Sequence, residues 1–161
     1  MGTVESWDGK RLFSTDAMCW DTGATVRAGE MYTVRLQVVK PWLTHNGMTP
    51  ASPEGIEASR MPHLSGFAFI PFRRSLSGGW HQPFVTIAQG EARATQGLSF
   101  HASGSSYEAT FEPVASGHVY LWVNDSVVGW TGLTSWSYQN NKGTALVRFD
   151  GASTVAAQAP P

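Results

Sequence analysis

Two polar motifs in the C-terminal part of the chain carry the side chains best suited to bind a metal ion. Asp125 follows the apolar segment 119–123, and Asn140 and Asn141 precede a second apolar segment. Calcium takes roughly six to eight oxygens from carboxylates, amide side chains, backbone carbonyls and water, so Asp125, Asn140 and Asn141 could supply three ligands. Because Asp125 is the one charged group among them, we expect a modest affinity. The alternative is that both motifs are turns whose side chains bond their own backbone.

Tryptophan is the second notable residue type, with 7 in the chain. Aromatic faces stack on the apolar face of a sugar ring and are enriched at recognition surfaces. Trp42, Trp130 and Trp136 fall in predicted loops, and His45 lies in the long Pro- and Gly-containing stretch 40–62. We therefore predict that these four residues bind a ligand. A long loop inside a compact domain is often functional, although a plain surface loop is the alternative for this stretch.

The common enzyme motifs are missing. The sequence has no Gly-x-Ser-x-Gly elbow, no phosphate-binding Gly-rich loop with Lys, no His-Glu-x-x-His and no dinucleotide fingerprint. The 5 histidines are scattered, and none pairs with another at a metal-ligand spacing. We expect no enzyme activity. Because a catalytic triad is defined by geometry, a hydrolase that uses His45 or His63 with Glu54 or Glu57 stays open as an alternative.

The basic pair Arg73–Arg74 directly follows the apolar run 67–72. Arginines can clamp a carboxylate or a phosphate through bidentate hydrogen bonds. The interpretation we favour is that they end a strand and pair with acidic residues, because a two-residue basic pair is common.

The composition excludes several classes of function. The 161 residues include 11 basic and 12 acidic residues, a formal net charge of -1 that is not the basic footprint of a nucleic-acid-binding protein. With 1 Cys, an intramolecular disulfide framework and a thiolate metal cluster are excluded. No apolar run approaches the roughly 20 residues of a membrane-spanning helix, so we expect a soluble domain.

The elements that must position the site residues are predicted strands. Segment 31–38 alternates apolar and polar residues with the period of two of a half-buried strand. The alternating segments 107–112 and 119–123, joined by a Ser-Gly turn, predict an antiparallel hairpin. If residue 125 and the Asn140–Asn141 turn are also neighbours in one hairpin, the segment between them folds over the metal site. Further strands are predicted at 67–72, 84–87 and 144–149.

Short strands, frequent turn residues and the absence of a helical period favour an all-β fold. We predict an antiparallel β-sandwich of the jelly-roll kind in a single domain over residues 9–150, with a closed barrel as the alternative. Residues 1–8 are expected to be a linker or an added start. Residues 151–161 are expected to be a flexible tail or linker, because small uncharged residues and terminal prolines bury too little to offset their ordering entropy.

The motifs in residues 119–149 also resemble a known family. A Leu-Trp-Val strand, Asn124-Asp125, Asn140-Asn141-x-Gly143 and a following strand are similar to the C-terminal part of the calcium-dependent bacterial galactophilic lectins, which are small jelly-roll sandwiches. In that family the aspartate and both asparagines ligate calcium, which then holds sugar hydroxyls. The resemblance therefore gives these roles to Asp125, Asn140 and Asn141.

The sequence departs from the family in two respects. The loop between the motifs is longer, and the family's threonine ligand corresponds to Thr131, to Thr134 or to neither. The family's sugar-contacting histidine and glutamine have no identified counterpart in residues 40–62, so galactose specificity does not carry over.

The sequence thus predicts a lectin-like module that binds carbohydrate with the help of calcium and has no catalytic activity. Its expected partner is a glycan, of the galactose type or another. The resemblance implies an accessory domain of a larger bacterial protein. The sequence does not fix the compartment, and a secreted or periplasmic location in a bacterium is one expectation for a soluble domain. The alternative is a structural or protein-interaction sandwich domain of such a protein that binds neither calcium nor sugar. The missing sugar-contact residues and the low charge are the reasons for considering this alternative.

Overall fold

Strand β3 (Tyr32–Thr44) shows how the alternating sequence pattern builds the fold. Its residues Tyr32, Val34 and Leu36 are buried, and the side chains between them are more accessible. Successive side chains of a strand point to opposite faces, so β3 packs one face against a core. The structure is a computed structural model that describes residues 11–44, 49–61, 65–127, 136–151 and 153–154.

Sheet A combines strands from both ends of the chain. Its order is β1 (Leu12–Ser14), β10 (Lys142–Asp150), β3, β8 (Ser106–Phe111) and β7 (His101–Ser103), and the short β4 (Thr49–Ala51) also pairs with β3. All of these pairs are antiparallel.

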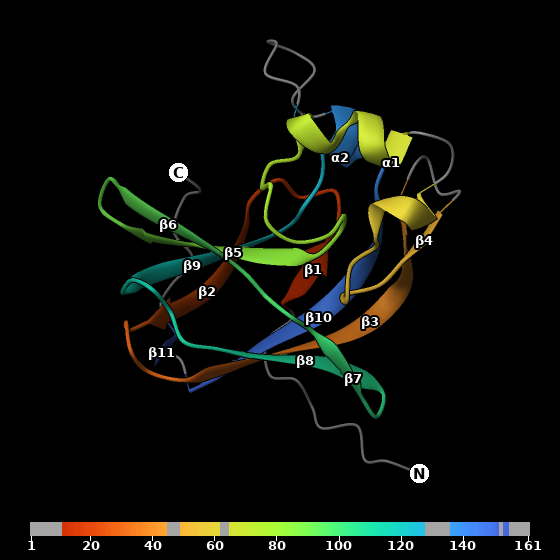
Figure 1. The fold of residues 1–161 in the computed structure, drawn as a ribbon. Helices are drawn as coiled ribbons and strands as arrows, with labels where there is room; N and C mark the ends of the chain where they lie inside the picture. The colour runs from red at the N-terminus through yellow and green to blue at the C-terminus, as the bar shows by residue number, and fades with distance from the viewer. Residues whose placement is uncertain (1–10, 45–48, 62–64, 128–135, 152, 155–161) are drawn as a thin grey trace.

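Sheet B is also antiparallel, with the order β11 (Ser153–Thr154), β2 (Trp20–Val26), β9 (Gly117–Val123), β5 (Pro83–Gln89) and β6 (Ala92–Gly97). The two sheets pack face to face as a sandwich in a single domain (Figure 1). The predicted all-β antiparallel sandwich is therefore confirmed.

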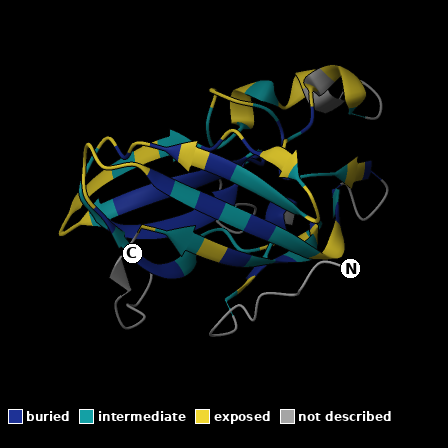
Figure 2. Ribbon diagram, turned by 90° about the horizontal axis from the view of Figure 1, so that it is seen from below, coloured by how far each residue is buried: buried dark blue, intermediate teal, exposed yellow. Residues whose placement is uncertain are grey.

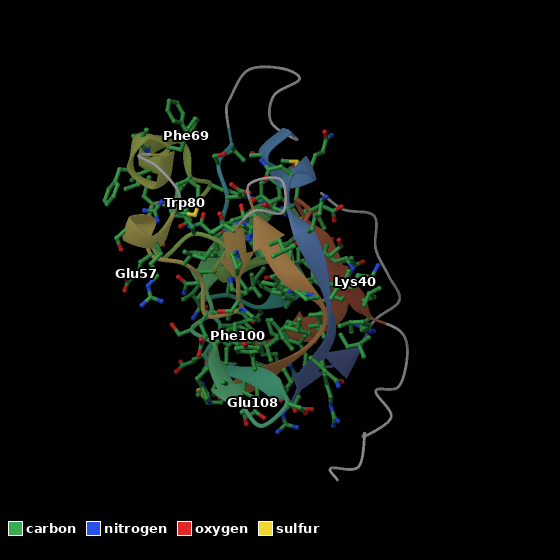
Figure 3. All side chains as sticks on the ribbon, turned by 90° about the vertical axis from the view of Figure 1, so that its right-hand side faces the viewer. Lys40, Glu57, Phe69, Trp80, Phe100 and Glu108 are labelled. Atoms are coloured by element: carbon green, nitrogen blue, oxygen red, sulfur yellow. The ribbon has the colours of Figure 1, made fainter. Side chains whose placement is uncertain are left out.

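The core lies between the two sheets. Along several strands buried residues alternate with more accessible ones (Figure 2). Phe100, labelled in Figure 3, belongs to this core. Both sheets contribute large side chains to it, among them Phe13, Leu36, Trp42, Ile87 and Leu121.

Four short helical segments complete the described chain: η1 (Ala58–Arg60), α1 (Ser65–Ala68), η2 (Ile70–Phe72) and α2 (Trp136–Gln139). Helices α1 and α2 lie beyond one end of the sandwich (Figure 1). The strand predicted over 67–72 is wrong. Pro71 stands at the start of η2, where its missing N–H costs no helical hydrogen bond, whereas a strand would lose one ladder bond there.

The predicted strands at 31–38, 84–87 and 144–149 are confirmed within β3, β5 and β10. The hairpin predicted from segments 107–112 and 119–123 is wrong. Both segments are strands, but β8 belongs to sheet A and β9 to sheet B. The connection between them therefore crosses from one sheet to the other.

Two boundaries also differ from expectation. The stretch 40–62 is not irregular throughout, because β3 continues to Thr44 and β4 pairs with it. Strand β11 comes from the expected C-terminal tail and pairs with β2, whereas the expected linker 1–8 lies outside the described residues. Among the described residues, no helix is long and apolar enough to cross a membrane.

Candidate metal-binding site

The antiparallel hydrogen bonding between β5 and β9 continues before the start of β5 and beyond the end of β9. The N–H of His81 donates to the Asn124 carbonyl at 2.8 Å, and the N–H of Asn124 donates to the Gln82 carbonyl at 2.8 Å. Backbone pairing of this kind places the next residues of the two strands side by side. It therefore brings His81 beside Asp125.

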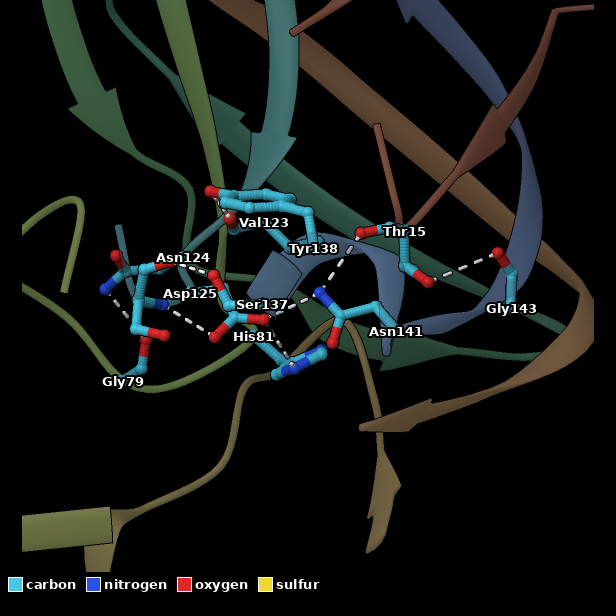
Figure 4. A network of polar contacts seen from close by, with 11 residues as sticks. Thr15, Gly79, His81, Val123, Asn124, Asp125, Ser137, Tyr138, Asn141 and Gly143 are labelled. Atoms are coloured by element: carbon cyan, nitrogen blue, oxygen red, sulfur yellow. Dashed lines mark hydrogen bonds and ion pairs between the residues drawn. The ribbon is translucent and has the colours of Figure 1, made fainter. Parts of the chain in front are cut away.

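Asn141 reaches the same place from the opposite sheet. Its Nδ2 donates to Asp125 Oδ2 at 2.7 Å and to the Thr15 carbonyl at 3.4 Å (Figure 4). Asp125 and Asn141 do not belong to one hairpin, because Asp125 follows β9 in sheet B and Asn141 precedes β10 in sheet A. The structure nevertheless brings the two side chains together, at the seam between the sheets.

The carboxyl group of Asp125 is deeply buried, with 6% of the residue exposed. Burial raises its pKa to about 6, and hydrogen bonds from Ser126 and Asn141 oppose part of that rise. One of these bonds joins the Ser126 N–H to Asp125 Oδ1 at 2.6 Å. At neutral pH Asp125 is therefore mostly a buried carboxylate.

No arginine or lysine of the described residues makes an ion pair with this carboxylate. Its neighbour is His81, whose Nε2 lies 3.8 Å from Asp125 Oδ2. Burial lowers the pKa of His81 to about 4, and the Asn141 side chain opposes part of that change, so the imidazole is neutral at neutral pH. A buried charge without a counter-charge is costly, and this cost is the main electrostatic feature of the site.

Several buried polar atoms around Asp125 make no hydrogen bond within the described part of the chain. They include Asn141 Oδ1 and both ring nitrogens of His81, and Asn140 Oδ1, one residue earlier in the chain, is buried without a hydrogen bond as well. Each unpartnered buried group costs about 1–3 kcal/mol and calls for an explanation. A cation bound by the Asp125, Asn140 and Asn141 oxygens would neutralise the carboxylate and give both amide oxygens a partner. Asp125 and Asn141 therefore fit a hard cation such as calcium if the Asn141 amide turns its oxygen, in place of Nδ2, toward the carboxylate.

The donor set also limits the kind of metal site. Among the described residues, no three His, Cys, Asp or Glu side chains are placed to hold an ion together. A site here would thus depend on amide and backbone oxygens beside the one carboxylate. That set is unlike the thiolate- and imidazole-rich sets of structural zinc sites.

Asn124 has a structural role that the sequence did not indicate. It is fully buried, its Oδ1 accepts the Ser75 N–H at 2.9 Å, and its Nδ2 donates to the carbonyls of Ser75 at 3.0 Å and Gly79 at 3.1 Å. The side chain therefore fixes the loop 75–79 that leads to His81. The available signal was an amide residue directly after an apolar strand, which reads equally well as a turn.

Helix α2 is fixed to the same strand end. The Tyr138 hydroxyl donates to the Val123 carbonyl at 2.8 Å, and the Ser137 hydroxyl donates to the Ser126 carbonyl. Both side chains are buried. These bonds hold the segment before Asn140 against the segment that carries Asp125.

The structure tests only part of the predicted ligand-binding set of tryptophans and His45. Trp42 lies on β3, so its placement in a loop is wrong; it is 2% exposed and packs edge-on against Phe13, with ring centroids 6.0 Å apart. A ring so deeply buried presents no face to a sugar. His45 and Trp130 lie outside the described residues, and Trp136 begins α2 with a side chain that is not described.

The arginine pair binds backbone and aromatic rings. Arg73 donates to the carbonyls of Gly78 at 2.6 Å and Leu76 at 3.1 Å, and its guanidinium lies 5.6 Å from the centre of the Trp80 ring. The Arg74 guanidinium lies 4.0 Å from the centre of the Trp122 ring. The pairing with acidic residues that we favoured is not what the structure shows for these two side chains.

The sequence matches no protein-family model, no curated protein and no solved structure. Thr131, Thr134 and His63, which the sequence analysis considered, lie outside the described residues.

Proposed function

We propose that the protein is a calcium-assisted carbohydrate-binding module without catalytic activity. The observation that carries the proposal is the buried Asp125 carboxylate, which has no arginine or lysine partner among the described residues and lies beside the Asn141 amide. A cation is the simplest partner for such a group.

Asp125 supplies the charge of the proposed site, and Asn140 and Asn141 supply neutral amide oxygens. Because the site is buried, water screens the attraction between the carboxylate and an ion less than it would at the surface. The hydrogen bonds from α2 to the carbonyls of Val123 and Ser126 hold the two motifs in place before an ion binds. Preorganisation of this kind lowers the entropic cost of binding.

The carbohydrate part of the proposal is supported by resemblance. The Asn-Asp and Asn-Asn-x-Gly motifs stand in the order found in the galactophilic lectins, and the sandwich fold agrees with that family's architecture. When bound, calcium supplies coordination positions that sugar hydroxyls can occupy. The identity of the sugar is left to a glycan array.

The test is calorimetric titration of calcium into the protein and into the Asp125→Asn variant, followed by a glycan array in calcium and in chelator. We expect the wild type to bind calcium and the variant to bind it at least about tenfold more weakly, because the only charged ligand is lost. Glycan binding should depend on calcium and disappear in the variant.

Glu91→Gln is the matched control. Glu91 is an exposed carboxylate in the turn between β5 and β6. It follows the end of β5, whereas His81 stands before the start of that strand, at the site. Glu91→Gln changes the net charge by the same amount as Asp125→Asn. Because Glu91 is not at the site, the substitution should leave calcium affinity unchanged. Equal calcium and glycan binding by Asp125→Asn and wild type would rule the proposal out.

A protein-interaction domain is the second candidate, and one observation favours it. Phe67, Phe69, Phe72 and Leu76 are exposed within ten residues of the chain, the rings of Phe69 and Phe72 lie 6.2 Å apart, and Phe69 lies at the outer edge of the molecule (Figure 3). Exposed apolar groups of this kind are common at protein contacts. This candidate predicts no heat of calcium binding in the same titration.

A further inference from the structure

His81 is a fully buried side chain to which the proposed oxygen site gives no role. It is 0% exposed, and neither Nδ1 nor Nε2 makes a hydrogen bond of ordinary geometry among the described residues, although the Asn141 side chain lies close enough to act on the pKa of the ring. A buried neutral histidine normally donates from one ring nitrogen and accepts at the other. Two ring nitrogens without ordinary hydrogen bonds therefore indicate that another group binds at this position.

The distance from His81 to Asp125 fits two side chains that bind the same metal ion. His81 Nε2 lies 3.8 Å from Asp125 Oδ2, which is too long for a hydrogen bond. Two atoms that each bind one divalent cation at about 2.1 Å lie about 3–4 Å apart at ordinary coordination angles. The nitrogen and the oxygen are thus spaced as two ligands of one ion would be.

The backbone holds the imidazole at this position. Among the described residues, His81 is the non-glycine residue with a positive φ, of 59°. Such a conformation costs about 1 kcal/mol or more in a residue with a side chain, and it persists where the surroundings impose it. Here the hydrogen bond from the His81 N–H to the Asn124 carbonyl at 2.8 Å fixes it, and the ring faces Asp125 (Figure 4).

We propose that the His81 ring nitrogen is a further ligand for divalent transition metals such as Mn²⁺, Co²⁺ and Zn²⁺, so that the site binds these cations in addition to the calcium held by its oxygen ligands. This inference rests on the proposed metal site. Carboxylate and carbonyl oxygens suit calcium, whereas imidazole suits the later transition metals. A set with Asp125, Asn141 and His81 combines both preferences, which the oxygen ligands alone would not do.

The direct test is spectroscopy on the wild-type protein. With Mn²⁺ bound, pulsed electron paramagnetic resonance should show hyperfine coupling to a directly bound nitrogen. With Co²⁺ bound, the visible absorption bands should differ from those of aqueous Co²⁺. Neither measurement depends on a variant that has to fold.

His81→Gln then assigns the nitrogen. We expect its affinity for Mn²⁺ and Co²⁺ to fall at least about tenfold and the nitrogen coupling to vanish, while calcium affinity changes by less than about threefold. His101→Gln is the control, because His101 is an exposed imidazole on β7 and its loss should change neither affinity.

The outcomes separate the two proposals. Calcium binding without nitrogen coupling to Mn²⁺ in the wild type would overturn the role of His81 and leave the oxygen site standing. Retention of the coupling in His81→Gln would overturn it as well. If the wild type binds none of these cations, the proposed metal site and this inference fail together.

Discussion

Burial shifts the pKa values of Asp125 and His81 in opposite directions. The pKa of Asp125 rises from 3.8 to about 6, so the folded state favours its protonated form and gains stability as pH falls through this range. The pKa of His81 falls from 6.5 to about 4, so the folded state favours the neutral ring. The stability that His81 contributes is present above pH 6.5 and is lost as pH falls toward 4. The two effects oppose each other in the metal-free protein.

Single substitutions at Asp125 and His81 should therefore change the pH dependence of the free energy of unfolding in opposite directions. In chelator, we expect His81→Gln to gain about 1–2 kcal/mol of unfolding free energy between pH 7 and pH 5, and Asp125→Asn to lose a similar amount, each relative to wild type. Urea unfolding at a series of pH values measures both. Parallel curves for the two variants would show that the opposing shifts do not govern the pH dependence.

The site residues differ in how far the sequence could predict them. Asp125 and Asn141 could be chosen because carboxylate and amide groups stand at the ends of apolar segments, and the structure places them together. His81 could not, because its neighbour Asp125 is distant in sequence and only strand pairing brings the two together. Trp42 was misplaced because the prolines and glycines of the stretch 40–62 predicted a loop, whereas β3 continues to Thr44.

At the scale of elements, Asn124, which directly follows β9, connects the end of that strand to the loop 75–79. Asn124→Ala removes its bonds to that loop and leaves buried backbone groups without partners. We expect it to lower the free energy of unfolding by about 2–3 kcal/mol, measured by urea unfolding.

Gln89→Ala provides the comparison, because Gln89 is an exposed amide at the far end of β5 and its loss should cost less than about 0.5 kcal/mol. An equal effect of the two substitutions would mean that Asn124 is not a structural anchor.

The strands themselves were largely predictable, but their pairing was not. Period-two alternation reports that a strand has one buried face, and this held for β3 and β8, whereas β9 is buried on both faces. It does not report which sheet the strand joins, so β8 and β9 were wrongly assigned to one hairpin. A continuous apolar run carries even less information, and 67–72 proved to be short helices with exposed Phe side chains.

At the scale of the whole molecule, the candidate site lies at the seam of the sandwich. Asp125 comes from sheet B and Asn141 from sheet A, so an ion held between them would link the two layers. The chain has 1 Cys and therefore no disulfide of its own to serve that purpose. The sequence could predict the fold class, but the meeting of two sheet ends depends on tertiary packing.

The central claim is that calcium binds at this seam, and a crystal structure grown with calcium tests it most directly. We expect a strong spherical density peak, with anomalous signal, whose oxygen neighbours at about 2.4 Å include Asp125, Asn140 and Asn141. A structure at millimolar calcium with no ion there, and with Asn141 Nδ2 still donating to Asp125 Oδ2 at 2.7 Å, would contradict the claim.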